Sequence, residues 1–115
     1  MHVTQRGLLV LSLVVAALAG ALTEPARAAD AVAGRAKARA VCQTCHGEDG
    51  KATVAGAANL SGQQKEYLVE QLRAYRSGSR RHEQMNIIAK SLADADIENV
   101  SEWYSSIKVT VETPN

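Results

Sequence analysis

The chain has 115 residues, of which 46% are hydrophobic, 13 are Lys or Arg and 12 are Asp or Glu. This length accommodates one small domain and excludes a multidomain enzyme or a doubly wound nucleotide-binding fold. The formal net charge of +1 disfavours a nucleic-acid binder held by a strongly basic face.

Residues 1–28 have the pattern of a secretory signal peptide. A positively charged start is followed by an uncharged, mostly apolar run over residues 7–22, and Ala26-Arg27-Ala28 places small residues where a signal peptidase requires them. We expect cleavage after Ala28, with Ala29 as the second candidate. The alternative is an uncleaved membrane anchor, but a spanning helix needs about 20 apolar residues, and this run is shorter.

The mature domain predicted by this cleavage, residues 29–115, has little material for a hydrophobic core. It holds 36 hydrophobic residues, of which 14 are Ala, and its formal net charge is zero. A domain this small usually needs disulfides, a metal or a partner for stability. We therefore expect an apolar group that is not an amino acid to complete the core.

Helices are predicted in the first half of this domain. Good helix formers fill Ala31–Val41. Apolar residues spaced three and four apart mark Gln63–Arg76 as a strong amphipathic helix, and Ser77-Gly78-Ser79 ends it. Between these helices, Lys51–Leu60 shows neither a helical nor a strand period, so we expect a loop there.

The second half of the domain is also predicted to be helical. Gln84–Lys90 is expected to form a short helical turn. Ser91 and Asp94 stand at capping-box spacing, which predicts a last helix that opens at Ser91 and ends near Ser106. Since only Val109-Thr110-Val111 has weak strand character, the predicted fold class is all-α, with three to four helices.

The run Cys42-Gln43-Thr44-Cys45-His46 is the one dense group of chemically active side chains. Its spacing is typical of covalent haem c attachment. Two Cys residues three apart at a helix end project to one side, where each thiol can add to one vinyl group of the haem. The imidazole of His46 lies on the same face and can reach the iron.

Three other chemistries are compatible with parts of this run. A thioredoxin-like redox pair needs a βαβ context, which the sequence lacks. A structural zinc site needs four ligands, and the fourth candidate, His82, lies 36 residues from His46. A disulfide between Cys42 and Cys45 would be strained and would close a very short loop. Haem c is therefore the predicted cofactor.

Met85 is the predicted sixth ligand of the iron, since it is the only Met outside the signal peptide. A thioether opposite His raises the reduction potential of a haem. The ordinary role of Met is to fill gaps in a core, but Met85 follows a polar stretch. His82 is the rival ligand, and an open coordination position is the third possibility.

These features together resemble the class I c-type cytochromes. The nearest likeness is to the small bacterial monohaem type, which is similar to one half of the dihaem periplasmic cytochromes c. The likeness covers nearly all of Gly34–Ile107. It rests on the runs Cys42-Gln43-Thr44-Cys45-His46-Gly47, Asn59-Leu60-Ser61-Gly62-Gln63, Tyr67-Leu68, Gln71-Leu72, Tyr75-Arg76-Ser77-Gly78-Ser79-Arg80, Met85, Leu92-Ala93-Asp94-Ala95-Asp96-Ile97 and Trp103-Tyr104.

The resemblance implies a cytochrome c fold around one covalently bound haem. Cys42 and Cys45 would hold the haem, His46 would be the proximal iron ligand and Met85 the distal one. Relatives commonly carry Pro before the Asn-Leu pair, in the region whose carbonyl fixes the proximal imidazole. Here that residue is Ala58, and a backbone carbonyl is still available for the bond to His46.

The resemblance also implies packing and surface roles. Gly34 matches the small residue at which the first and last helices cross, with Tyr104 or Trp103 as its aromatic partner. An arginine group is expected either to meet a haem propionate or a partner, or to be a solvated face; it comprises Arg73, Arg76, Arg80 and Arg81. The residues expected to wall the haem are Leu60, Leu68, Leu72, Ile87, Ile88 and Leu92.

The implied function is single-electron transfer in the periplasm between redox protein partners. The expected state is a monomer that binds no nucleic acid and no small-molecule substrate, and that meets the membrane only through partner complexes. One alternative is a haem c subunit of a dehydrogenase, such as a flavin-dependent sulfide dehydrogenase. Another is a haem enzyme or sensor with an open iron site.

Overall fold

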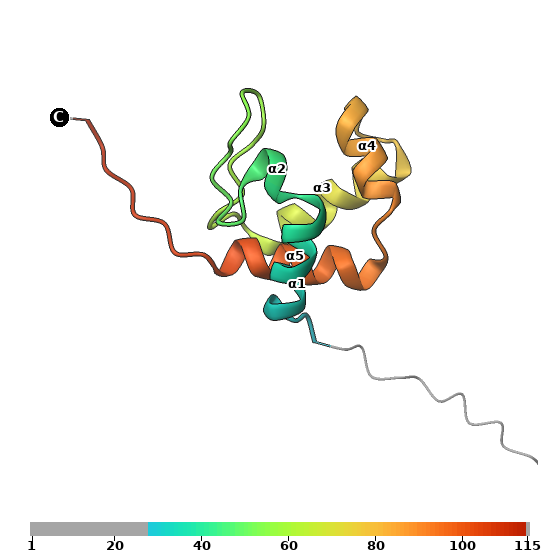
Figure 1. Cartoon of the computed structure of the whole chain (residues 1–115), viewed down its shortest axis with the longest axis horizontal. Helices are drawn as coiled ribbons and strands as arrows, with labels where there is room; N and C mark the ends of the chain where they lie inside the picture. Colours follow the sequence, from blue (N-terminus) through green and yellow to red (C-terminus); the bar gives the residue numbers. More distant parts are fainter. Residues whose placement is uncertain (1–27, 115) are drawn as a thin grey trace, which may run out of the picture.

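A computed structural model describes residues 28–114, and no strand occurs within them (Figure 1). The predicted signal peptide lies outside the described residues, apart from Ala28. None of the helices in the described part is long and apolar enough to span a bilayer. Their bounds in chain order are α1 Ala31–Val41, α2 Gln43–His46, α3 Lys65–Ser77, α4 Glu83–Lys90 and α5 Asp94–Ser106.

Helix α1 has the bounds that its composition predicts. Asp30 caps its first turn, where Oδ1 accepts hydrogen bonds from the N–H groups of Val32 at 2.8 Å and Ala33 at 3.1 Å. Such a cap satisfies N–H groups that have no partner within the helix. The cap therefore sets where α1 begins, directly after the predicted signal peptide.

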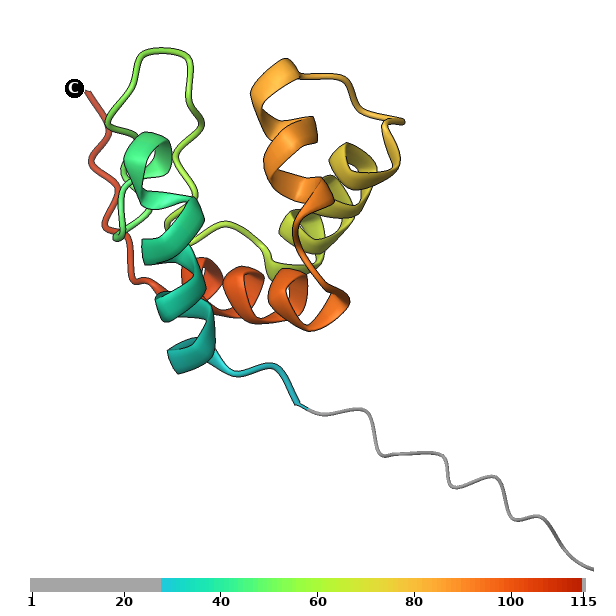
Figure 2. The same ribbon diagram turned by 45° about the vertical axis from the view of Figure 1, so that its right-hand side comes forward.

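Helix α5 is the base on which α1 and α3 rest (Figure 2). Helix α1 crosses α5 at Gly34, where an added Cβ would lie 1.9 Å from the carbonyl oxygen of Asn99 and 3.0 Å from Cβ of Trp103. The two backbones are therefore in direct contact. Of the two aromatic partners expected for Gly34, the structure selects Trp103.

The protein core is small and divided. Within residues 28–114, eight hydrophobic residues are buried. One cluster joins α1, α3 and α5 through Ala38, Leu68 and Tyr104. The other joins α3, α5 and the segment before α5 through Val69, Ile97 and Leu92. This sparse packing agrees with the expectation that the amino acids alone leave the core incomplete.

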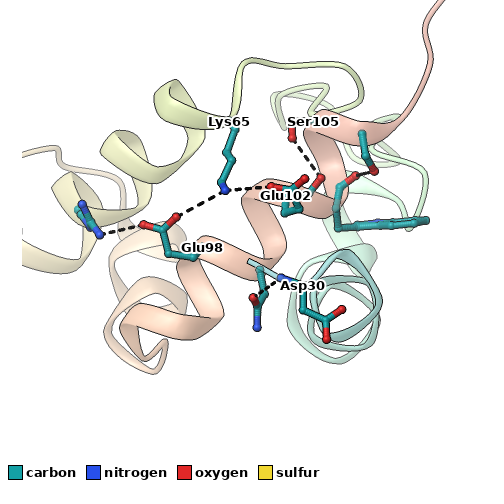
Figure 3. A network of polar contacts seen from close by, with 9 residues as sticks. Asp30, Lys65, Glu98, Glu102 and Ser105 are labelled. Atoms are coloured by element: carbon teal, nitrogen blue, oxygen red, sulfur yellow. Dashed lines mark hydrogen bonds and ion pairs between the residues drawn. The ribbon is translucent and has the colours of Figure 1, made fainter. Parts of the chain in front are cut away.

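Ion pairs reinforce the contact between α3 and α5 (Figure 3). The ammonium of Lys65 lies 2.9 Å from a carboxylate oxygen of Glu102 and 3.9 Å from one of Glu98. Arg73 binds the other oxygen of Glu98 at 3.0 Å. The hydrogen bond to Glu102 raises the pKa of Lys65. These partly exposed pairs link α3 to α5 and contribute little stability each.

The predicted N-cap of the last helix, Ser91, is wrong by two residues, because the N-cap is Ala93. Ser91 belongs to the end of α4, because its hydroxyl donates to the carbonyl of Ile88 at 2.7 Å. Helix α5 begins at Asp94, and the carboxylate of Asp96 accepts the N–H of Ala93 at 3.0 Å. Helix α4, predicted as a short helical turn over Gln84–Lys90, is a helix of eight residues that begins one residue earlier, at Glu83.

The arginine group does not act as one surface. Arg73 binds Glu98, and Arg76 donates to the carbonyl of Leu92 at 3.1 Å and to Asp94 at 2.5 Å. Arg73 and Arg76 therefore hold α3 against α5 and against the segment that precedes α5. Arg80 donates to Gln71 at 2.6 Å and stacks on the ring of Tyr75, while Arg81 is exposed.

Candidate haem site

The two Cys residues lie where α1 gives way to α2. Cys42 has helical backbone angles, and its carbonyl accepts hydrogen bonds from the N–H groups of Cys45 at 3.3 Å and His46 at 3.0 Å. One helical turn therefore spans the run and brings the three residues together, as the spacing predicts. Both thiols are free and half-buried.

Gly47 ends α2 and starts the turn that follows it. Its φ of 74° lies in the region that favours glycine, and an added Cβ would lie 2.3 Å from the carbonyl oxygen of Lys51. The hydroxyl of Tyr104 donates to the Gly47 carbonyl at 3.0 Å. Helix α5 therefore holds the end of the Cys-containing turn through a buried hydrogen bond.

The predicted loop folds back onto α2. The N–H of Thr53 donates to the carbonyl of Cys45 at 2.9 Å, and its hydroxyl donates to the carbonyl of Thr44 at 2.8 Å. At the other end of the loop, the N–H of Leu60 donates to the carbonyl of Gly50 at 2.7 Å. The loop is thus tied at both ends, which sets the position of the residues between them.

These ties bring Ala58 to the imidazole of His46. The distance from Nδ1 of His46 to the carbonyl oxygen of Ala58 is 2.7 Å. A carbonyl only accepts, so Nδ1 carries the proton and Nε2 keeps its lone pair. This tautomer is the one that a metal ligand bonding through Nε2 requires, and the carbonyl fixes the ring's orientation. The expected backbone partner is present without Pro.

The surroundings of Cys42 disfavour thiolate chemistry. Burial raises the pKa of the Cys42 thiol to about 11, and the nearby Tyr104 hydroxyl and Lys37 offset only part of that effect. The thiol is therefore protonated at neutral pH, whereas a thioredoxin-like redox pair uses a thiolate whose pKa is lowered. Within residues 28–114, no three His, Cys, Asp or Glu side chains form a metal-binding group.

The two candidate distal ligands have different surroundings. Met85 lies half-buried in the first turn of α4. His82 is the N-cap of that helix, and its Nδ1 accepts the N–H of Met85 at 3.3 Å. Since Nδ1 accepts, Nε2 of neutral His82 carries the proton and has no lone pair for a metal. The cap favours Met85 as the ligand.

Helices α2 and α4 stand on opposite sides above α5 (Figure 2). Met85 on α4 and His46 on α2 therefore belong to helices on opposite sides of the fold. Leu60 and Leu68 pack in the cluster that includes Cys42, whereas Leu92 is buried in the second cluster. Of the remaining expected wall residues, Leu72 and Ile88 are half-buried and Ile87 is 62% exposed.

The sequence does not indicate the hydrogen bonds that three residues make around the site: Thr53, Asn59 and Tyr104. Thr53 and Asn59 brace the loop from within, since Asn59 Oδ1 accepts the N–H of Ala52 at 2.8 Å. Tyr104 fits a helical stripe, and that pattern predicts burial but not the bond to Gly47. The polar residues in this Ala- and Gly-rich loop are the one signal that could have found the first two.

Comparison with known proteins places this site in a family. The family model "Cytochrome c" matches residues 31–108. Cytochrome c4 of Pseudomonas aeruginosa is 37% identical over 84 residues, which are 73% of this chain and 41% of that protein. Cytochrome c-554(548) of Halomonas halodenitrificans is 39% identical over 82 residues, which are 69% of this chain and 98% of that protein.

Solved structures agree with these matches. Reduced cytochrome c4 from Pseudomonas stutzeri superposes with a TM-score of 0.66 at 35% identity, covering 73% of this chain and 48% of that chain. Cytochrome c4 from Acidithiobacillus ferrooxidans gives the same TM-score at 29% identity. The chain thus spans about half of these cytochromes c4, and nearly all of the shorter relative. It belongs to the cytochrome c family and has one covalently attached haem c.

Proposed function

We propose that this chain is a periplasmic monohaem carrier whose haem is held by Cys42 and Cys45 and ligated by His46 and Met85. The observation that carries the proposal is the 2.7 Å contact between His46 Nδ1 and the Ala58 carbonyl. It leaves Nε2 as the free nitrogen, on the turn that also presents both thiols.

The residues contribute attachment, orientation and exclusion of water. The haem supplies exchange of one electron between its ferrous and ferric states. Two thioether bonds from Cys42 and Cys45 keep the cofactor in place, and the Ala58 carbonyl holds the His46 ring. Leu60 and Leu68, which pack beside Cys42, keep this side of the site dry. A thioether from Met85 raises the reduction potential.

Export and partners follow from the same chemistry. The pattern of residues 1–28 supports cleavage of a signal peptide and delivery of residues 29–115 to the periplasm. The partners of such a carrier are redox proteins. Interfaces between redox proteins are small and transient, which suits a monomer that meets a donor and an acceptor in turn.

Met85→Ala tests the ligand assignment. The variant should keep its covalent haem, because the turn that carries Cys42 and Cys45 is on the opposite side of the fold from α4. It should lose the weak ferric absorption band at the red edge of the visible spectrum, which marks Met–haem ligation. It should also bind carbon monoxide readily and show a lower reduction potential. Absorption spectra, carbon monoxide titration and voltammetry measure these three effects.

His82→Asn is the control for Met85→Ala. Asn is a good N-cap, so α4 keeps its first turn while the imidazole is lost. If Met85 ligates the iron, the band near the red edge persists in His82→Asn. Absence of the band from the unchanged protein, together with ready carbon monoxide binding by His82→Asn but not by Met85→Ala, would assign the distal position to His82.

A second candidate function is a haem c subunit within a dehydrogenase complex. One relative is the "Thiosulfate dehydrogenase electron acceptor" of Stutzerimonas stutzeri, 33% identical over 69 residues, which are 57% of this chain and 32% of that protein. Size-exclusion chromatography of a native extract separates the two functions. A free carrier elutes at the size of one small domain, whereas a subunit elutes with its large partner.

A further inference from the structure

Helix α4 presents Met85 but has little apolar anchorage of its own. Ala89, near its C-terminal end, is the only fully buried residue among its eight. Its neighbour is α3, and Ile87 on α4 is 62% exposed. The first turn, which carries Met85, therefore depends on polar contacts for its position.

Asn86 supplies those contacts from the position next to Met85. Its Nδ2 donates to the carbonyl of Tyr75 at 2.6 Å and to the carbonyl of Arg80 at 2.9 Å. Its Oδ1 accepts the N–H of His82 at 2.7 Å. The reverse orientation of the amide would face its oxygen toward two carbonyls, so the contacts determine which atom is nitrogen.

The three bonds reach three segments that lead into the first turn of α4. Tyr75 lies in the last turn of α3, Arg80 lies in the loop after it, and His82 is the N-cap of α4. His82 in turn accepts the N–H of Met85. Asn86 thus satisfies a terminal carbonyl of one helix and holds the residue that caps the next. One side chain fixes the first turn of α4 against the end of α3.

We propose that Asn86 is the positioning residue that holds Met85 in place for the iron. The proposal rests on the ligation by Met85 proposed above. Without the Asn86 amide, the first turn of α4 separates from α3, and Met85 spends more time away from the iron. The apparent affinity of ferrous haem for carbon monoxide reports this directly, because it scales with the fraction of molecules in which the distal position is open.

The test compares Asn86→Ala with Gln84→Ala in the holoprotein. Gln84 flanks Met85 on the other side, is exposed, and within the described residues makes no side-chain hydrogen bond. Asn86→Ala should keep its covalent haem, weaken the ferric band near the red edge and raise the apparent carbon monoxide affinity about tenfold or more. Gln84→Ala should match the unchanged protein in all three measurements.

The outcomes separate this inference from the ligand assignment. Absence of the red-edge band from the unchanged holoprotein overturns ligation by Met85, and with it this inference. If the band is present and the two Ala variants bind carbon monoxide alike, only the positioning role of Asn86 is overturned. Should Asn86→Ala fail to accumulate, Asn86→Asp decides, since it keeps the acceptor for His82 and loses both donors. A carbon monoxide affinity equal to that of the unchanged protein then overturns the proposal.

Discussion

Gly34 shows how the absence of one carbon atom determines where two helices cross. A methyl group there would lie 1.9 Å from the Asn99 carbonyl oxygen, far inside van der Waals contact. Backbone atoms cannot rotate out of the way as the end of a side chain can. The same crossing places Asn99 Oδ1 2.8 Å from the N–H of Asp30, so the start of α1 is tied to α5 as well.

Gly34→Ala should therefore lower the free energy of unfolding by about 3 kcal/mol, as overpacking against an unyielding neighbour does. The gain in helix propensity, about 1 kcal/mol, offsets part of the clash and is included in that figure. Denaturant unfolding of the holoprotein measures the change. Ala36→Ser, on the exposed face of α1, is the control and should change stability by less than about 1 kcal/mol. A Gly34→Ala protein as stable as the control would contradict the close crossing.

At the level of elements, charged side chains add to the apolar contacts that hold α3 to α5 and to the segment before α5. The two arginines that do this differ in their surroundings. Arg76 is 31% exposed and reaches a partly buried carbonyl of Leu92, whereas Arg73 is 52% exposed and binds only Glu98. The guanidinium of Arg76 also lowers the pKa of Asp94.

Arg76→Gln should accordingly cost more stability than Arg73→Gln. Loss of the hydrogen bond to the Leu92 carbonyl costs about 1–2 kcal/mol, because a charged donor leaves a partly buried acceptor unpaired. Arg73→Gln should lower the free energy of unfolding by less than about 1 kcal/mol, and this difference should disappear at high salt. Thermal unfolding at two salt concentrations checks both. Equal losses in the two variants would assign Arg76 to an ordinary surface pair.

The arginine-dependent part of the contact has a defined pH dependence. Because Arg76 lowers the pKa of Asp94 in the folded chain, this pair stabilises the fold above the unfolded pKa of Asp. That contribution disappears as the pH falls through the lowered pKa. The free energy of unfolding should therefore fall at acid pH for this reason, and it should not change near neutral pH.

The elements differ in how far the sequence determines them. Helices α1 and α3 were predictable because composition and apolar spacing act within one helix. The start of α5 was not predictable in this way. From the sequence, Ser91 can be either the N-cap of the last helix or the C-cap of α4. That choice depends on whether its hydroxyl meets the Ile88 carbonyl, which only the packed chain decides.

The site follows the same division. The spacing of Cys42, Cys45 and His46 is local, so it predicts the turn that brings them together. The Ala58 carbonyl and the Asn86 amide act across 12 and 11 residues respectively, and backbone carbonyls carry no sequence signal at all. Such contacts come from the folded loop, and in the case of Ala58 only the resemblance to a family indicated where to look.

At the level of the whole molecule, we expect the domain to depend on its cofactor. Its buried side chains form two separate clusters rather than one continuous core, and two of the eight buried hydrophobic residues within 28–114 are Ala. Burial of this little apolar surface supplies too small a favourable term to offset the conformational entropy of the chain. We expect the haem to supply the apolar contact surface that makes up the difference.

The double variant Cys42→Ala, Cys45→Ala should therefore lose covalent haem and most of its folded structure together. Circular dichroism in the far and near ultraviolet should show reduced helix content and no fixed aromatic environment. Thermal melting should show no cooperative transition. A cooperative, helical apoprotein would contradict the dependence of the core on haem.

The crossing of α1 and α5 also sets an order of events in folding. The hydrogen bond between Asp30 and Asn99 closes a loop of 69 residues, and such a closure costs about 4 kcal/mol of chain entropy. Helix α1 therefore meets its main packing partner only once nearly the whole chain has been synthesised. Until then the attachment thiols are carried on an open polypeptide that lacks the Tyr104–Gly47 hydrogen bond holding their turn in the folded chain.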